Sequence, residues 1–188
     1  NMAYDQYRNA LPVGVAAGPD IQGPRITGGW DVGIVYVANG SMFETSIIAG
    51  RAMGMIFVAG NPADGNGNVA IDEFTDALGN VFIAGDIISL ISVQGNFSNA
   101  YVLAGVVDLG SDNMPAGVGT AHDTMKSGML DWLYVAGTSA EVVISAGADS
   151  GADGVYTTGD DRIVPGVSWV RNVALVGASS AVGANADA

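Results

Sequence analysis

Short apolar runs that end in a small residue and a glycine recur along this chain. Three early copies are VYVANG ending at Gly40, SIIAG at Gly50 and MIFVAG at Gly60. Ten residues hold one strand of about six residues and a bend of about four. Each ten-residue unit therefore predicts one short β-strand. Further copies end at Gly85, Gly95, Gly105, Gly137, Gly147 and Gly177, and a weaker one ends at Gly18.

A longer period contains these units. Long polar loops follow Gly18, Gly60, Gly105 and Gly147, at intervals of 42, 45 and 42 residues. This interval predicts a coil of three short strands in about 43 residues, with its long loop always leaving one corner. Stacked coils give three parallel sheets, so the predicted fold is all-β, a parallel β-helix or β-solenoid. A β-sandwich is the alternative for strands at this spacing, but the nested periods favour the solenoid.

The predicted organisation has three parts. Residues 13–177 form the β-solenoid domain, residues 1–12 an N-terminal arm or cap, and residues 178–188 a flexible or interface C-terminal tail. The sequence begins at Asn1 with no charged-then-apolar leader, so we expect a processed mature chain or a fragment.

Both faces of the predicted strands are apolar. Strand side chains alternate, so we expect residues two positions before each glycine to point inward and residues three positions before it to point outward. Eight of nine positions are apolar in each set, which is typical of sheets covered on both sides. The inward set is Ala38, Ile48, Val58, Ile83, Val93, Leu103, Val135, Ser145 and Leu175, and the outward set is Val37, Ile47, Phe57, Phe82, Ser92, Val102, Tyr134, Ile144 and Ala174.

This outer face must be covered by the chain's own loops, by a neighbouring domain or by other subunits. A short solenoid also has unpaired strand edges at its two ends. Together these features predict that the partners are copies of the chain itself. We expect an extracellular structural protein, the subunit of a self-assembling filament or surface layer.

Charge narrows the choice of partners. Nineteen acidic and six basic residues give a formal net charge of −13, which repels nucleic acid and anionic membranes and favours divalent cations. The chain contains no cysteine, so it has neither disulfides nor a thiolate metal site. It has no apolar run long enough for a transmembrane helix.

Two acidic loops are candidate calcium sites. The first, NPADGNGNVAIDEF after Gly60, partly matches an EF-hand loop, although Pro62 occupies the place of the first acidic ligand. The second, ADSGADGVYTTGDDRIV after Gly147, combines aspartates with flexible glycines. In both loops the alternative is a solvated turn. The candidate Ca²⁺ ligands are Asp64, Asn66, Asn68, Asp72, Glu73, Asp149, Asp153, Asp160 and Asp161.

The second loop carries a resemblance to a known family. The run ISAGADSGADGVYTTGDDRIVPGVSWVRNV resembles the repeat unit of long bacterial β-strand-repeat surface proteins. The resemblance extends over about residues 80–177 and is specific at residues 143–170. It implies an extracellular or cell-surface parallel β-helix without catalytic residues.

An enzyme is not expected. A polysaccharide lyase would need a basic cleft, and a hydrolase would need two separated carboxylates, whereas Asp160–Asp161 and Asp72–Glu73 are adjacent pairs. His122 is the only histidine, and nothing in the sequence positions it for catalysis. The remaining alternative is an adhesin that binds cell-surface glycans through exposed aromatic side chains. Trp30, Trp132 and Trp169 lie near coil starts and predict a packing column instead.

Overall fold

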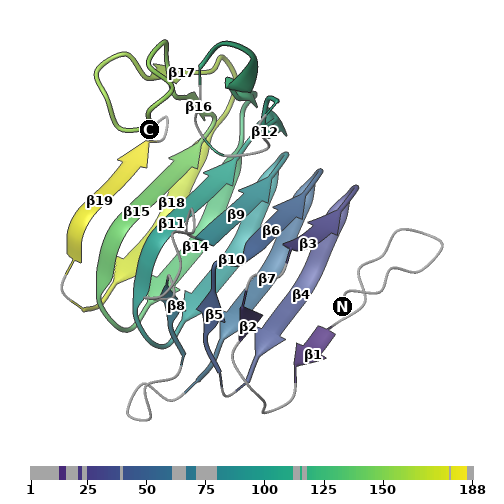
Figure 1. Cartoon of the computed structure of the whole chain (residues 1–188), viewed down its shortest axis with the longest axis vertical. Coiled ribbons are helices and arrows are strands. Elements are labelled where there is room, and N and C mark those ends of the chain that lie inside the picture. The colour runs from purple at the N-terminus through teal and green to yellow at the C-terminus, as the bar shows by residue number, and fades with distance from the viewer. Residues whose placement is uncertain are drawn as a thin grey trace.

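A computed structural model describes residues 13–15, 21–22, 25–38, 40–60, 67–70, 80–111, 115, 118–177 and 179–185. The fold is all-β, and its two main sheets consist of parallel strands (Figure 1). Parallel pairing throughout these sheets is incompatible with a sandwich built from hairpins. The alternative β-sandwich topology is therefore wrong for the described residues.

The first sheet has six strands in the order β1-β4-β7-β10-β14-β18. Its strands are rich in β-branched and aliphatic residues, which suit a buried pleated surface. Within β7, β10 and β14, every third or second residue is buried, and these residues form one face. The bounds are β1 Val13–Val15, β4 Asp31–Val37, β7 Ala52–Val58, β10 Ile87–Val93, β14 Met129–Val135 and β18 Trp169–Leu175.

The second sheet has nine strands because several of its layers are broken into two pieces. The long strand β11 pairs with β8 through Phe97 and with β9 through Ala100–Ala104, and β15 and β19 follow it. The bounds are β2 Ile21–Gln22, β3 Arg25–Gly28, β5 Met42–Phe43, β6 Ser46–Ala49, β8 Val69–Ala70, β9 Asn80–Ala84, β11 Phe97–Ala104, β15 Ser139–Ala146 and β19 Ser179–Asn185. Strand β19 lies within the segment expected to be a tail, and it pairs in parallel with β15.

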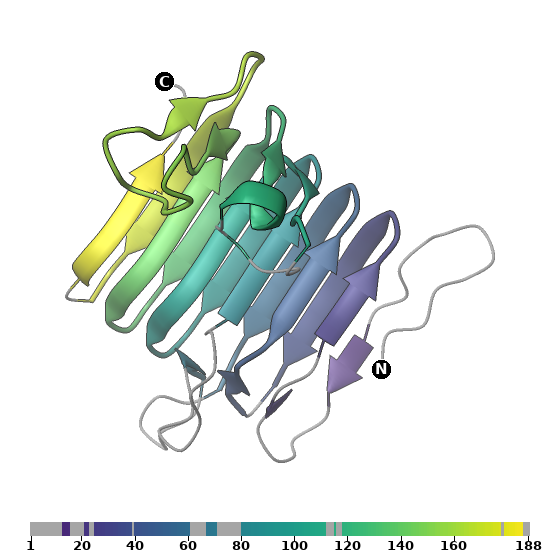
Figure 2. The same cartoon turned by 45° about the horizontal axis from the view of Figure 1, so that its top comes forward.

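Successive strands alternate between the two sheets, and Figure 2 shows the resulting layers stacked along one direction. Asp31 of β4 pairs with Ala52 of β7, 21 residues later. Ala52 pairs with Ile87 at an offset of 35 residues, and Ile87 pairs with Met129 at an offset of 42. The parallel pairing therefore survives large changes in the length of chain between layers.

These offsets correct the predicted repeat. Two ten-residue units, one strand in each sheet, already bring the chain to the next layer, so three strands per coil of about 43 residues is wrong. The longer offsets come from inserts, and the structure has two main sheets where three were expected. The loops also leave from both ends of the strands (Figure 1): β5 and β8 lie at one end, and β12, β16 and β17 at the other. A single exit corner is therefore wrong too.

One apolar core lies between the two sheets. It combines Val35, Ile56 and Leu133 of the first sheet with Ile47 and Phe82 of the second, all of them buried. In the first sheet, Val58, Val93 and Val135 face this core as predicted.

The predicted directions are reversed in the second sheet, where Phe82, Val102 and Ile144 point into the core. The reason is the position of the corner glycine. Strand β7 ends at Val58, two residues before Gly60, whereas β11 ends at Ala104, directly before Gly105. One residue fewer in the bend inverts the alternation relative to the glycine. Ile47 belongs to the same correction, and in the first sheet Val37 faces the core where Ala38 was expected.

Glycines form the corners between layers. The Gly67 N–H donates to the carbonyl of Gly40, the Gly95 N–H to Gly67, and the Gly137 N–H to Gly95. A Cβ atom on Gly137 would lie 2.5 Å from the Gly95 oxygen, closer than real Cβ atoms come to backbone. The corner therefore needs glycine for close backbone approach rather than for a special φ angle.

Two antiparallel strand pairs and one helical turn lie outside the main sheets. Strand β12 (Val106–Asp108) pairs with β13 (Thr124–Met125), and β16 (Ala148–Asp149) pairs with β17 (Arg162–Ile163). A 3-10 helix spans Gly119–Ala121. In the described parts of the chain, no helix is long and apolar enough to cross a membrane.

Candidate functional site

Two long segments cover the outer face of the nine-stranded sheet. We call residues 106–128, after β11, the first insert, and residues 148–168, after β15, the second insert. Both leave the same end of the strands and fold back over the sheet (Figure 2). Each begins at a corner glycine with positive φ, Gly105 at 92° and Gly147 at 66°. Glycine adopts this conformation without steric cost, so both corners can redirect the chain.

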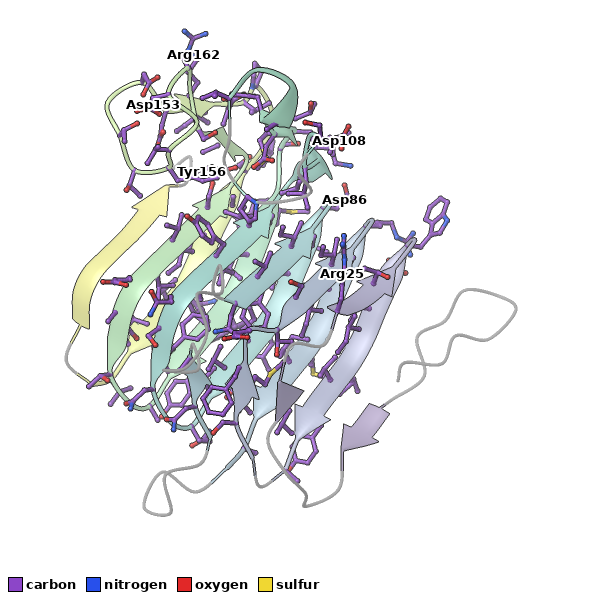
Figure 3. The ribbon with its side chains drawn as sticks, viewed as in Figure 1. Arg25, Asp86, Asp108, Asp153, Tyr156 and Arg162 are labelled. Carbon is purple, nitrogen blue, oxygen red and sulfur yellow. The ribbon has the colours of Figure 1, made fainter. Side chains whose placement is uncertain are left out.

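A second apolar cluster forms beneath the inserts. Ile83 and Leu103 point outward from the nine-stranded sheet and are buried by Leu109 and Met125 of the first insert and by Tyr156 of the second. Figure 3 shows Tyr156 at the base of the second insert, with Asp153 and Arg162 further out. The chain's own loops therefore bury this outer face, which is one of the three coverings expected from the sequence.

Polar contacts join the two inserts above this cluster. The Nε2 atom of His122 lies 2.8 Å from the carbonyl oxygen of Gly151 and 3.2 Å from Oδ1 of Asp149. The contact with the Gly151 carbonyl and the nearby carboxylates of Asp149 and Asp123 raise the pKa of His122, although partial burial opposes them. The sole histidine therefore links the inserts.

Below His122, the hydroxyl of buried Tyr156 donates to Oδ2 of buried Asp123 at 3.2 Å. Burial, reinforced by the adjacent Asp123 carboxylate, raises the pKa of Tyr156 strongly. The phenol therefore stays protonated and continues to donate this hydrogen bond.

The aspartates of the second insert surround one threonine. The hydroxyl oxygen of Thr158 lies 2.8 Å from Oδ1 of Asp160, 3.3 Å from Oδ1 of Asp153 and 3.5 Å from Oδ1 of Asp161. The Val155 carbonyl oxygen is 3.0 Å away. A hydroxyl has a single proton to donate, so it cannot satisfy four acceptors at once.

Backbone groups occupy other oxygens of the same carboxylates. Oδ2 of Asp160 accepts the N–H groups of Ala152 at 2.7 Å and Asp153 at 3.2 Å. Hydrogen bonds, first from the Thr158 hydroxyl and then from these N–H groups, lower the pKa of Asp160. All of these groups are exposed, and the loop holds its carboxylates in the ionised form.

The structure thus separates the four aspartates predicted to bind calcium. Asp153, Asp160 and Asp161 gather at Thr158, whereas Asp149 contacts His122 and accepts the N–H of Gly151 at 2.8 Å. In the described residues, no three acidic or histidine side chains are already arranged as ligands of one metal ion.

The first acidic loop is described only in part. Asp64, Asn66, Asp72 and Glu73 lie outside the described residues. Oδ1 of Asn68 accepts the N–H of Asn96 at 2.8 Å, and Oδ1 of Asn96 in turn accepts the N–H of Thr138 at 3.0 Å. Asn68 therefore belongs to a column of side chains that connects the layers at one corner, a role that its sequence position did not indicate.

The outer face of the six-stranded sheet is not buried by the inserts. We call the outward side chains of β4, β7, β10 and β14 the uncovered face. Tyr36 is 41% exposed, Met55 37% and Trp132 51%. The register places these side chains in two columns across the strands. The first column is Ile34, Met55, Leu90 and Trp132, and the second is Tyr36, Phe57, Ser92 and Tyr134.

The tryptophans do not form the predicted packing column. Trp132 is level with Asn172, whereas Trp169 is level with Met129. The Arg171 guanidinium stacks on Trp169 at 4.9 Å, and Arg51 lies over Trp30 at 5.5 Å. The sequence spacing was misleading because Trp132 lies within its strand and Trp169 at the start of its own.

A shallow hollow of about 200 Å³ remains beside the first insert, and sequence reasoning missed it. Its floor is apolar and includes Ile48, Ile83 and Leu109, and Arg25 and Asp108 contribute charged groups to its wall (Figure 3). Arg25 and Asp108 are 83 residues apart in sequence, so no local motif could have indicated the hollow.

Comparison of the chain with protein-family models, curated proteins and solved structures finds no match. The resemblance to bacterial β-strand-repeat surface proteins therefore stays a prediction made from the sequence.

Proposed function

We propose that the chain is a β-solenoid module of an extracellular structural protein, and that its copies assemble with one another. The alternation of strands between two stacked parallel sheets supports the solenoid. The resemblance of residues 143–170 to surface-protein repeats supports the extracellular location.

One observation carries the proposal of assembly. The outer face of the nine-stranded sheet is buried by the inserts, whereas the uncovered face exposes Tyr36, Met55 and Trp132 on adjacent layers. Contiguous apolar surfaces on soluble proteins usually mark interaction sites. A structural subunit gives such a surface a use, because a neighbouring copy removes it from water.

The test of this function is the state of the purified chain. Light scattering across a concentration series and negative-stain electron microscopy should reveal dimers or larger regular particles that grow with concentration. A chain that stays monomeric throughout the series would contradict the structural function.

Calcium stabilisation of the second insert is part of the proposal. Ca²⁺ takes six to eight oxygen ligands, and carboxylate, hydroxyl and carbonyl oxygens already gather at Thr158. Asp153, Asp160, Asp161, Thr158 and the Val155 carbonyl would hold the ion, which would screen the repulsion among three carboxylates. Asp149 would stay with His122.

Thermal unfolding with calcium and with a chelator tests this site. We expect calcium to raise the unfolding temperature of the wild type and to have little effect on Asp160→Asn, Asp161→Asn. The matched control is Asp108→Asn, which removes an acidic group from the first insert and should leave the calcium response intact. An equal calcium response in the double variant would exclude this loop as the site.

Glycan binding is the second candidate function, because the uncovered face presents the exposed aromatic rings of Tyr36 and Trp132. Sugars stack on such rings in many binding sites. A monomeric chain that sediments with insoluble polysaccharide, and loses this property in Trp132→Ala, would favour an adhesin over a structural subunit.

A further inference from the structure

We propose that the uncovered face is the contact surface for a second copy of this chain, packed face to face about a two-fold axis. This inference rests on the proposed structural function and specifies which surface meets which partner. Four properties of the face support it: its columns, its charge, its area and its symmetry.

The columns supply a regular apolar surface. Paired residues place Ile34 beside Met55 and Met55 beside Leu90, and the second column has Tyr36 beside Phe57. The rings of Tyr36 and Phe57 already meet edge to face, with centroids 6.2 Å apart. Sheets that pack face to face bury side chains of this kind between them.

Charge makes this the surface on which two copies can approach each other. The chain carries a formal charge of −13, so two copies repel over most orientations. The fully described strands β7 and β10, AMGMIFV and IISLISV, contain no charged residue. At the rim, Arg51 forms an ion pair with Asp31, and Arg171 lies 3.6 Å from Asp131. The face is therefore apolar at its centre and locally neutralised at its edge.

The area is large enough for a specific pair. Five strands about 4.8 Å apart, each about seven residues long, cover roughly 24 Å by 23 Å. Burying this patch on both partners would remove about 1,100 Å² from water, which is at the lower end of the range for specific interfaces. The face therefore meets the minimum that a stable pair needs.

The chemistry favours a protein partner over a sugar. Recognition of a glycan requires polar groups that meet its hydroxyls, whereas Ile34, Met55 and Leu90 offer none. In the two columns, hydroxyl groups come only from Ser92, Tyr36 and Tyr134. Aliphatic and aromatic groups in equal measure match a second copy of the same face, because the patch is self-complementary in polarity.

Symmetry gives the pair a definite centre. When identical patches meet, the interface is isologous and closes after two copies. Strand β10 is central among the strands that form the patch, and Leu90 is its outward residue in the first column. Leu90 of one copy therefore lies close to Leu90 of the other, whichever in-plane direction the two-fold axis takes.

A charge introduced into the face tests the surface. We expect Met55→Glu to weaken self-association at least about tenfold, because the two-fold axis brings two new carboxylates together. Tyr36→Glu is a second variant with the same expected result. The control is Val118→Glu, which changes an equally exposed apolar residue of the first insert and should associate like the wild type. Denaturation curves must show that each variant is folded.

Crosslinking tests the geometry. The chain has no cysteine, so Leu90→Cys introduces a unique thiol. Mild oxidation should convert this variant into a covalent dimer, whereas Val118→Cys should stay uncrosslinked at the same concentration. Failure of Leu90→Cys to crosslink in a protein that still associates would overturn the two-fold arrangement.

The outcomes separate this inference from the function on which it rests. A wild type that assembles, together with a Met55→Glu variant that assembles equally well, would overturn the interface and leave the structural function intact. A wild type that is monomeric under all conditions would overturn both. Binding of polysaccharide by that monomer, lost in Met55→Glu, would instead assign the face to a glycan.

Discussion

The two sheets share one core and one stacking register, yet their outer faces have opposite fates. On the nine-stranded sheet, outward residues such as Leu103 are completely buried beneath the inserts. On the six-stranded sheet, the corresponding outward residues, such as Met55 and Trp132, are exposed to solvent. Apolar residues at outward positions of a strand therefore do not specify their covering. The chain satisfies one face internally and leaves the other for a partner.

The sheets also differ in backbone. Glu44, Asn99 and Glu141 of the nine-stranded sheet have positive φ values of 53°, 48° and 54°. Asn99 and Glu141 lie at the same level of adjacent strands, between the paired residues Ser98–Ala140 and Ala100–Val142. No described non-glycine residue of the six-stranded sheet has a positive φ. The nine-stranded sheet bends at this level, and the six-stranded sheet keeps the flatter face that face-to-face packing requires.

The largest expected effect separates the covered face from the uncovered one. Tyr156→Ala removes a buried ring, 3% exposed, that joins the second insert to the sheet. We expect it to lower the free energy of unfolding by about 3–5 kcal/mol. Trp132→Ala, the matched loss of an aromatic ring from the uncovered face, should change it by less than about 1 kcal/mol in dilute protein. Chemical denaturation measures both, and equal losses would contradict the contrast.

The shared register is tested next, at a corner between the sheets. Gly137→Ala places a Cβ atom 2.5 Å from the Gly95 oxygen, so adjacent layers must move apart. We expect a loss of about 1–3 kcal/mol in unfolding free energy. Gly159→Ala is the control, because a Cβ atom there meets no atom within 4 Å. A Gly137→Ala variant as stable as its control would show that the layers are not in close contact.

The bend of the nine-stranded sheet predicts a gain in stability. Glu141 is exposed and adopts a left-handed conformation that costs residues with a Cβ atom about 1 kcal/mol. Glu141→Gly should therefore raise the free energy of unfolding by about 0.5–1 kcal/mol. Glu141→Ala retains the Cβ atom and should show no such gain. Thermal denaturation of the two variants side by side would detect the difference.

The smallest effect is expected at the rim of the uncovered face. Hydrogen bonding from the Arg51 guanidinium lowers the pKa of Asp31 below its usual 3.8. The ion pair therefore stabilises the folded chain above that pH, and its contribution is lost as the pH falls through the lowered value. Both side chains are solvent-accessible, so the contribution is small. Asp31→Asn should be slightly less stable than the wild type at about pH 7 and indistinguishable from it near pH 2.

The sequence predicted the strands better than their arrangement. Gly50, Gly60, Gly85, Gly95 and Gly105 each follow a strand in the structure, and the main sheets are parallel as expected. The number of sheets was wrong because a ten-residue period specifies one strand and one bend, but not how many bends complete a layer. That number depends on the angle of each corner, which backbone contacts between distant glycines determine.

The candidate site was predictable only where its parts are close in sequence. The aspartates around Thr158 lie within nine residues of one another, so composition alone indicated them. The cluster beneath the inserts joins Leu103, Met125 and Tyr156, and the contact between His122 and Gly151 joins two separate loops. Such contacts depend on the stacking of β11 and β15, which no local pattern encodes. The contrast between the outer faces was unpredictable for the same reason.

The spacing of the paired strands has a consequence for how such a chain can change over time. Offsets of 21, 35 and 42 residues all deliver the next strand to the same register, because corner glycines bond only to the layer beside them. New sequence can therefore enter at a corner without disturbing strands elsewhere. The fold behaves as a scaffold with docking points for grafted loops, where a lineage can acquire or discard a surface segment in a single event. A protein engineer could use the same corners to display foreign peptides.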